Sequence, residues 1–186
     1  MKRRILALML ATVMAFGVAA CGGAEKEEQG DPVVTEMVTT LQSYAPDLDA
    51  AAAAEAGLYT IADGAVAGGQ EEWDAFMAEE KDSVIICQFS MKGGAMLDYL
   101  RRMEDGSYLL ISDISRDGYE YEDKQDYTAQ FFTQIKVFGD FVAVEGGTPH
   151  TIGVMTNDPA LDADTFLKYW AEVSYEENGA FLLFVI

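Results

Sequence analysis

Histidine and cysteine are scarce in this chain of 186 residues, and their scarcity excludes several kinds of site. The single histidine is His150, and the two cysteines are Cys21 and Cys87. A zinc site built only from histidine and cysteine needs about four such ligands, so these three residues cannot complete one. Three motifs are also missing: the Gly-x-Ser-x-Gly elbow of serine hydrolases, the phosphate-binding loop and the Gly-x-Gly-x-x-Gly dinucleotide fingerprint.

Basic residues are few as well, with 12 Lys and Arg against 32 Asp and Glu. Three of the 12 are Lys2, Arg3 and Arg4, so without its first 20 residues the chain has a formal charge of −23. Binding to phosphate groups depends on Lys and Arg, and we therefore expect no nucleic acid partner. An acidic surface instead favours solubility and attracts cations and basic partners.

The three basic residues lead into an uncharged apolar run at residues 5–18. This run is shorter than the about 20 residues of a membrane-spanning helix. A basic start, a short apolar stretch and small residues behind it are typical of a signal peptide. The stretch ends with the segment Val18-Ala19-Ala20-Cys21.

This segment resembles the lipobox of bacterial lipoproteins, in which an aliphatic residue and two small residues precede a cysteine. The resemblance implies cleavage between Ala20 and Cys21, and a diacylglyceryl group with chains such as palmitate on the Cys21 thiol. It also implies a protein anchored by lipid at the extracytoplasmic face of the cell membrane. Two acyl chains suffice for stable anchoring, since each buried methylene contributes about 0.8 kcal/mol. The alternative is an ordinary secretory signal peptide in which Cys21 has no role.

We expect three parts along the chain: a signal peptide at 1–20, a flexible tether at 21–30 and one globular domain at 31–186. The tether is rich in Gly, Glu, Lys and Gln and holds no apolar anchor. The remaining 156 residues are enough for one hydrophobic core. The hydrophobic content of the whole chain is 50%, and the apolar residues continue throughout this part, which argues against intrinsic disorder there.

The hydrophobic pattern predicts an α+β fold with N-terminal helices, an antiparallel β-sheet built as a meander, and one late helix packed on it. The first helix begins at Asp31-Pro32 and carries an apolar stripe to residue 45. A second helix, capped by Asp47, is expected through 50–54, and a third at 70–80. The expected strands of one sheet are 84–91, 96–103, 108–114, 127–138, 141–145, 151–156 and 181–186. A loop is expected at 63–69 and a turn at 139–140.

The acidic segment 113–124 is the one candidate metal site. Its opening matches a calcium loop, with oxygen-bearing side chains at positions 1, 3 and 5 and glycine at position 6. Position 12 is Lys124 instead of a bidentate Glu, so a plain turn at Asp117-Gly118 is favoured. The candidate ligands are Asp113, Ser115, Asp117, Glu120 and Asp123, with Glu122 and Asp126 as further carboxylates.

Three other features allow a functional and a structural interpretation. We expect Tyr119, Tyr121 and Tyr127 to cover a sheet edge, with binding of sugars or cationic groups as the alternative. Cys87 is expected to be a small buried hydrophobe whose pKa is raised, not a nucleophile.

The late helix, which begins near Asp162, carries an aromatic stripe. This stripe is expected to pack on the sheet, with a partner-binding ridge as the alternative; its members are Phe166, Tyr169 and Trp170.

A second resemblance involves short motifs spread over about a quarter of the chain. The motifs are Trp73 with Phe76, the strand at Val84, Gly106-Ser107-Tyr108, and Asp113 followed by Arg116-Asp117. They resemble small uncharacterised lipoproteins of Gram-positive bacteria, and this resemblance implies no particular activity.

The sequence favours a non-enzymatic binding or accessory domain held at the membrane by lipid. A protein, a peptide or a cell-wall component is the expected partner, because 156 residues are few for a two-lobed solute receptor. One alternative is an extracytoplasmic hydrolase that uses His150 or a pair of acids. Another is a calcium-dependent binding module. Apart from the covalent lipid on Cys21, no cofactor is expected.

Overall fold

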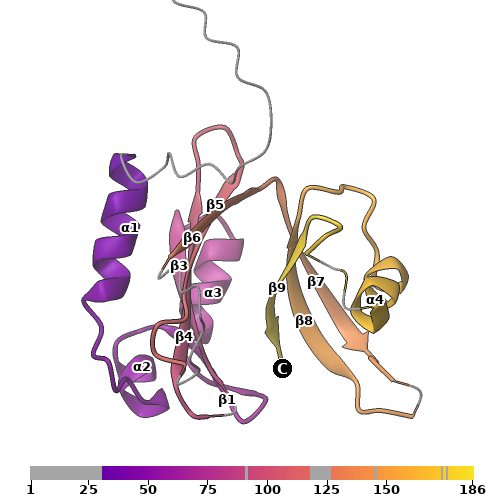
Figure 1. Ribbon diagram of the computed structural model, residues 1–186, viewed down its shortest axis with the longest axis horizontal. Coiled ribbons are helices and arrows are strands. Elements are labelled where there is room, and N and C mark those ends of the chain that lie inside the picture. The colour runs from indigo at the N-terminus through magenta and orange to yellow at the C-terminus, as the bar shows by residue number, and fades with distance from the viewer. Residues whose placement is uncertain (1–30, 91, 118–126, 145, 173, 175) are drawn as a thin grey trace, which may run out of the picture.

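Two β-sheets and four helices make up the part of the chain that the structure describes (Figure 1). The structure is a computed structural model that describes residues 31–90, 92–117, 127–144, 146–172, 174 and 176–186. A six-stranded sheet has the order β2-β1-β3-β4-β5-β6, and a three-stranded sheet has the order β7-β8-β9. The predicted α+β class is confirmed. The prediction of a single sheet is wrong, because β6 and β7 belong to different sheets.

The helix α1 (Pro32–Gln42) forms where the sequence predicts it. The Asp31 carboxylate accepts a hydrogen bond of 2.7 Å from the Val33 amide, and proline occupies the first turn, where a missing N–H costs nothing. In α2 (Ala50–Glu55) the cap is Asp49, which accepts from the Ala52 amide at 2.8 Å. The predicted cap, Asp47, is therefore wrong, since only Asp49 stands next to the first helical residue.

The six-stranded sheet contains the predicted meander. Its strands are β1 (Tyr59–Ala62), β2 (Ala65–Gly68), β3 (Ser83–Phe89), β4 (Ala95–Arg102), β5 (Tyr108–Asp113) and β6 (Thr128–Phe132). The strands β3 to β6 pair in antiparallel fashion, whereas β1 pairs with β3 in parallel. The loop predicted at 63–69 is instead a hairpin. Asp63 and Gly64 turn the chain there with φ of 51° and 72°, the positive values that a tight hairpin uses.

The three-stranded sheet consists of β7 (Gln134–Phe141), β8 (His150–Thr156) and β9 (Ala180–Val185). The strand predicted at 127–138 breaks at Thr133, where Asn157 replaces the ladder bonds. Its Oδ1 accepts from the Thr133 amide at 2.9 Å, and its Nδ2 donates to the Phe131 carbonyl at 3.2 Å. The chain thereby passes from one sheet to the other.

The turn predicted at 139–140 and the strand predicted at 141–145 are also wrong. The strand β7 continues to Phe141, and the irregularity is a shift in register against β8 between Phe138 and Phe141. Asp140 takes a positive φ of 53° at this shift, typical of a bulge in place of a hairpin.

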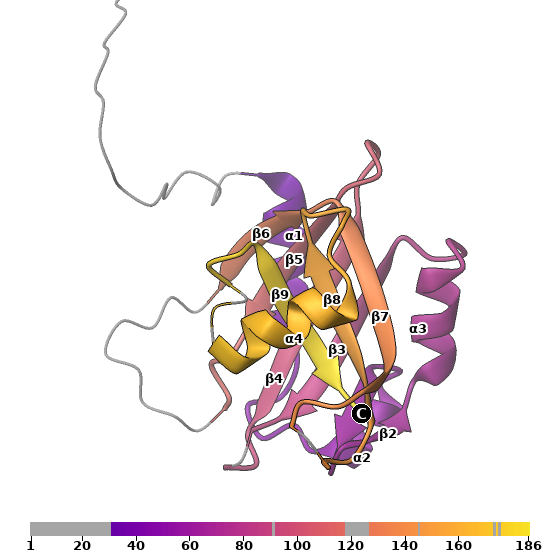
Figure 2. The same cartoon turned by 90° about the vertical axis from the view of Figure 1, so that its right-hand side faces the viewer.

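Each face of the six-stranded sheet is covered by different elements. On the outer face, α1 and α2 pack over a cluster that includes Cys87, Leu97 and Ile111. On the inner face, α3 (Gln70–Met77) and the three-stranded sheet pack over residues such as Ile86 and Leu110. The helix α4 (Ala163–Glu172) lies across the far side of the three-stranded sheet (Figure 2).

Candidate functional site

The inner face of the six-stranded sheet changes from apolar to polar along its strands. Because side chains alternate between faces, Asp98 on β4 shares the inner face with Leu100, which packs in the cluster that holds Leu183 and Phe184 of β9. The apolar part of this face is Val84, Ile86, Leu100, Leu110 and Phe132. The polar part comprises Gln88, Asp98, Ser112 and Gln130, and Met96 lies among them by register. We call this second group the polar end of the inner face.

Asp98 is the central residue of the polar end. It pairs in register with Ser112 on β5, and the Ser112 hydroxyl donates a hydrogen bond of 2.5 Å to its Oδ1. Only 7% of Asp98 is exposed. Its other oxygen, Oδ2, accepts no hydrogen bond from a residue within the described ranges.

The second oxygen of Asp98 nevertheless keeps some contact with solvent. Within the described ranges, Arg102 Nε is the one side-chain nitrogen or oxygen that is fully enclosed and has no hydrogen-bond partner. Asp98 Oδ2 is not in that state, so a small part of the oxygen surface remains accessible. The carboxylate is thus buried on most sides and open on one.

Burial is the main cause that raises the pKa of Asp98, and the hydrogen bond from Ser112 opposes part of this rise. The resulting pKa is about 6. A charge in a poorly solvated position is costly unless it is paired. Among the described residues this carboxylate forms no ion pair. Carboxylates in such surroundings are found preferentially at functional sites.

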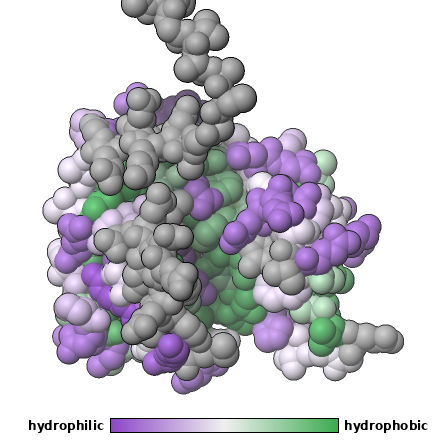
Figure 3. Space-filling view, viewed as in Figure 1, coloured by the Kyte–Doolittle hydropathy of each residue, from purple (hydrophilic) through white to green (hydrophobic). Residues whose placement is uncertain are grey.

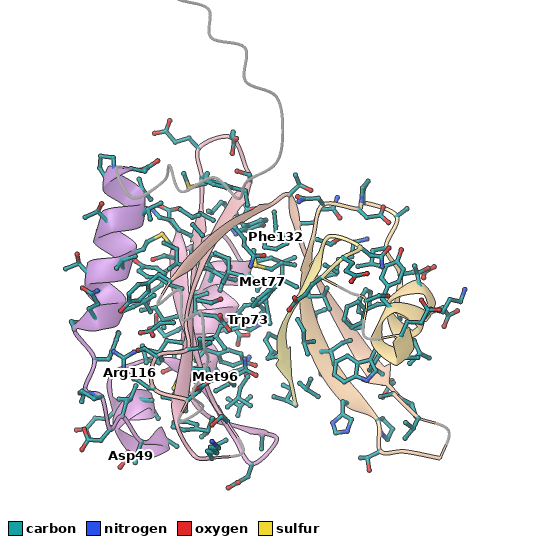
Figure 4. All side chains as sticks on the ribbon, viewed as in Figure 1. Asp49, Trp73, Met77, Met96, Arg116 and Phe132 are labelled. Carbon is teal, nitrogen blue, oxygen red and sulfur yellow. The ribbon has the colours of Figure 1, made fainter. Side chains whose placement is uncertain are left out.

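The space in front of the polar end lies between the two sheets. Gln88 Nε2 donates a hydrogen bond of 2.5 Å to the Leu183 carbonyl, which ties the edge strand β9 to β3. Phe132 meets Phe181 of β9 with 6.3 Å between ring centroids. Figure 3 shows a hollow between the sheets that is lined with hydrophobic residues. In Figure 4, Met96 and Phe132 lie on the side of the six-stranded sheet that faces β9. We call this space the inter-sheet groove.

The predicted calcium ligand Asp113 is engaged elsewhere, on the opposite side from the inter-sheet groove. Its fully buried carboxylate forms an ion pair with Arg116. Arg116 Nη2 also donates to the carbonyls of Leu41 at 2.9 Å and Tyr44 at 3.0 Å, and its Nε donates to that of Ala45 at 3.1 Å. The pair therefore holds the carboxyl end of α1 against β5, which is a structural role.

The other predicted ligands are only partly described. The Ser115 amide donates to Asp113 Oδ1 at 2.9 Å, and the buried Asp117 accepts a bond of 2.6 Å from the Ser90 hydroxyl through its main-chain carbonyl. Within the described ranges, no group of three or more His, Cys, Asp or Glu side chains could hold a metal ion. Outside the described residues lie Glu120, Glu122, Asp123, Asp126, Tyr119 and Tyr121. Cys21 and the rest of residues 1–30 lie outside them as well.

The remaining candidates occupy structural positions. His150 is the first residue of β8, opposite Phe141, and has no hydrogen bond to a carboxylate of the described part of the chain. Cys87 is buried as predicted. Burial raises its pKa to about 12, against a smaller lowering by Arg116, so the reactive thiolate is suppressed.

Tyr127 packs against the outer-face cluster, in agreement with a covering role. The aromatic stripe of α4 also packs on a sheet as predicted. Phe166 is fully buried, and its ring lies 5.9 Å from that of Phe141 on β7. Tyr169 and Trp170 pack against the same cluster.

Asp98 and Ser112 were not among the site residues predicted from the sequence. One signal was present: Asp98 is the only charged residue in Ala95-Met96-Leu97-Asp98-Tyr99-Leu100, an otherwise apolar run. An acid within an apolar strand is unusual and suggests a specific role.

Comparisons of the chain with family models, with curated proteins and with solved structures gave no match. Within the described residues, no helix is long and apolar enough to cross a membrane.

Proposed function

We propose that this protein is a bacterial lipoprotein whose globular domain binds a protein or peptide partner at the extracytoplasmic face of the cell membrane. The anchor in this proposal is a diacylglyceryl group on Cys21, and the binding surface is the inter-sheet groove. Support for the anchor comes from the basic start, the apolar run and the segment that ends at Cys21.

The single observation that supports binding is the state of Asp98. A carboxylate that is nine-tenths buried and open on one side costs stability, and it is compensated if a partner supplies the missing donor. Hydrophobic residues around it offer the apolar contact area that binding sites use.

A hydrolase is less well supported than a binding domain. The hydrolase alternative uses His150 or a pair of acids, so two such groups would have to lie within hydrogen-bond reach of each other or of the same substrate atom. Within the described residues, Asp98 accepts its hydrogen bond from a serine hydroxyl, and His150 has no bond to a carboxylate.

The anchor is tested by replacing Cys21 and following the protein in cells fed with a labelled fatty acid. We expect wild type to carry the label and to sediment with membranes, and Cys21→Ala to lose both properties. Cys87→Ala is the matched control, because it removes the other thiol and should leave label and sedimentation unchanged. A Cys21→Ala protein that keeps the label and still sediments would contradict the proposal.

The binding surface is tested by cross-linking in intact cells. Full-length wild type and Asp98→Asn are compared for the partner that each captures. We expect the captured partner to be lost from Asp98→Asn and kept by Glu55→Gln. The second variant is a matched control, because it removes one carboxylate charge as well, but from an exposed residue of α2. Equal capture by all three proteins would place the binding surface elsewhere.

A further inference from the structure

We infer that the inter-sheet groove binds a lysine side chain of a basic, extended peptide segment, and that Asp98 is the acceptor for its ammonium group. This inference rests on the proposed function and names the chemistry of the partner. Three observations of the groove support it.

The first observation is an unfilled acceptor. Asp98 Oδ1 is occupied by the Ser112 hydroxyl, whereas Oδ2 receives no donor from the described residues and remains accessible. An ammonium group has three donors and no acceptor, so it can donate to this oxygen without bringing an acceptor that the carboxylate would repel. A charge-assisted bond of this kind is also stronger than a bond between neutral groups.

The second observation is the lining next to the carboxylate. Met96 precedes Asp98 by two residues on β4 and therefore shares its face, and Ile86 is the register partner of Asp98 on β3. A lysine side chain has an apolar stem of four methylene groups that ends in a charge. The methylene stem can pack against the apolar side chains of Met96 and Ile86, and the ammonium group at its end can bind the Asp98 carboxylate.

The third observation is the sign of the charge. The chain without residues 1–20 has a formal charge of −23, and no described Lys or Arg forms an ion pair with Asp98. An acidic surface raises the local concentration of basic segments and speeds their association. Arg102 shares the inner face, but its guanidinium donates to the Phe76 carbonyl at 2.8 Å and lies over the Phe76 and Tyr108 rings.

An extended segment fits the geometry better than a helix. The strand β9 is an edge strand of the three-stranded sheet and borders the groove through Leu183. Extended peptides commonly lie beside such edges and present alternate side chains to one surface. One side chain of the segment then reaches the polar end, and its neighbours contact the apolar part of the inner face.

The test uses full-length lipidated protein in phosphatidylcholine nanodiscs and capped, dye-labelled heptapeptides rich in valine. One peptide carries a central lysine and the other a central norleucine, which keeps the stem and removes the ammonium group. We expect the lysine peptide to bind at least tenfold more tightly by fluorescence anisotropy. Asp98→Asn should reduce its affinity to that of the norleucine peptide, and Glu55→Gln should leave it within twofold.

A second variant guards against a folding defect in Asp98→Asn. Met96→Lys places an ammonium group beside Asp98 from the same strand, so it should block the lysine peptide, whereas Met96→Leu should not. Equal affinity for the two peptides overturns the inference, and so does an equal loss in Asp98→Asn and Glu55→Gln. If the peptides fail but Asp98→Asn still loses the partner captured in cells, the inference fails while the proposed function stands.

Discussion

Ser112 on β5 and Asp98 on β4 face each other in register, and the Ser112 hydroxyl lies 2.5 Å from the Asp98 carboxylate. Other elements pack on both faces of these strands, and only 7% of Asp98 is exposed, so the pair is largely buried where the inner face borders the inter-sheet groove. The hydrogen bond supplies one donor to a carboxylate that would have several in water. The hydrogen bond therefore lowers the free-energy cost of burying the Asp98 carboxylate but does not abolish that cost.

Asp98→Asn should stabilise the domain at neutral pH. The pKa of Asp98 rises from 3.8 to about 6 on folding, so the folded state binds the proton more tightly. The stability associated with this group is present below about pH 4 and is lost as the pH rises to about 6, a loss of about 3 kcal/mol. Asparagine has no such titration and keeps an oxygen for the Ser112 hydroxyl.

Urea unfolding of both proteins between pH 3.5 and 7.5 measures this effect. The other acids titrate alike in both, so the difference in unfolding free energy isolates Asp98. We expect the advantage of Asp98→Asn to grow between pH 4 and 6 and then to level off. A difference that is independent of pH would show that the carboxylate is well solvated.

Arg116→Met should destabilise the domain by about 3–5 kcal/mol, because it leaves the buried Asp113 charge without its partner. The same change also removes the donors of the Leu41 and Tyr44 carbonyls. The double variant Asp113→Asn/Arg116→Met should recover part of the loss, since no unpaired charge remains. Chemical denaturation of the two variants and wild type gives the values, and an equal loss in both variants would show that the helix contacts outweigh the ion pair.

Calcium at millimolar concentration should leave the melting temperature unchanged. An ion at the predicted site would have to displace Arg116 from Asp113, the first residue of the calcium-like segment. Ligands that bind only the folded state raise its stability, so a thermal melt with and without calcium is a direct check. A rise that disappears on adding a chelator would restore the calcium-dependent alternative.

Gly153→Ala should destabilise the domain by about 1–3 kcal/mol through overpacking. A Cβ at this position of β8 would lie 2.4 Å from Cε1 of Phe184. The Phe184 ring has little room to move, since it packs edge-on to Tyr59 at 5.6 Å and Trp73 at 5.2 Å. Gly139→Ala is the control, because a Cβ there meets no atom within 4 Å. Equal melting temperatures for the two variants would contradict this packing of β9 on β8.

Local patterns predicted the elements that local interactions determine. The helix α1 follows from Asp31-Pro32 and from the spacing of Val34, Met37 and Leu41, all of which are buried. The meander follows from apolar runs separated by glycine turns, such as the one at Gly106 with φ of 83°.

Other features depend on residues that are distant in sequence. The break at Thr133 is made by Asn157, 24 residues further along the chain, and no local pattern indicates such a contact. The burial of Asp98 likewise depends on residues that are distant from it in sequence. Alternation shows that Asp98 and Leu97 point to opposite faces of β4, but not that helices and a second sheet cover both faces.

The most direct test of the proposed lipoprotein is the intact mass of the mature protein extracted from membranes, with sequencing of its first peptide. The proposal predicts a chain that begins at Cys21 and carries a diacylglyceryl group on the sulfur, so that mild base hydrolysis reduces the mass by two acyl chains. A chain that begins elsewhere, or a Cys21 with a free thiol, would contradict it.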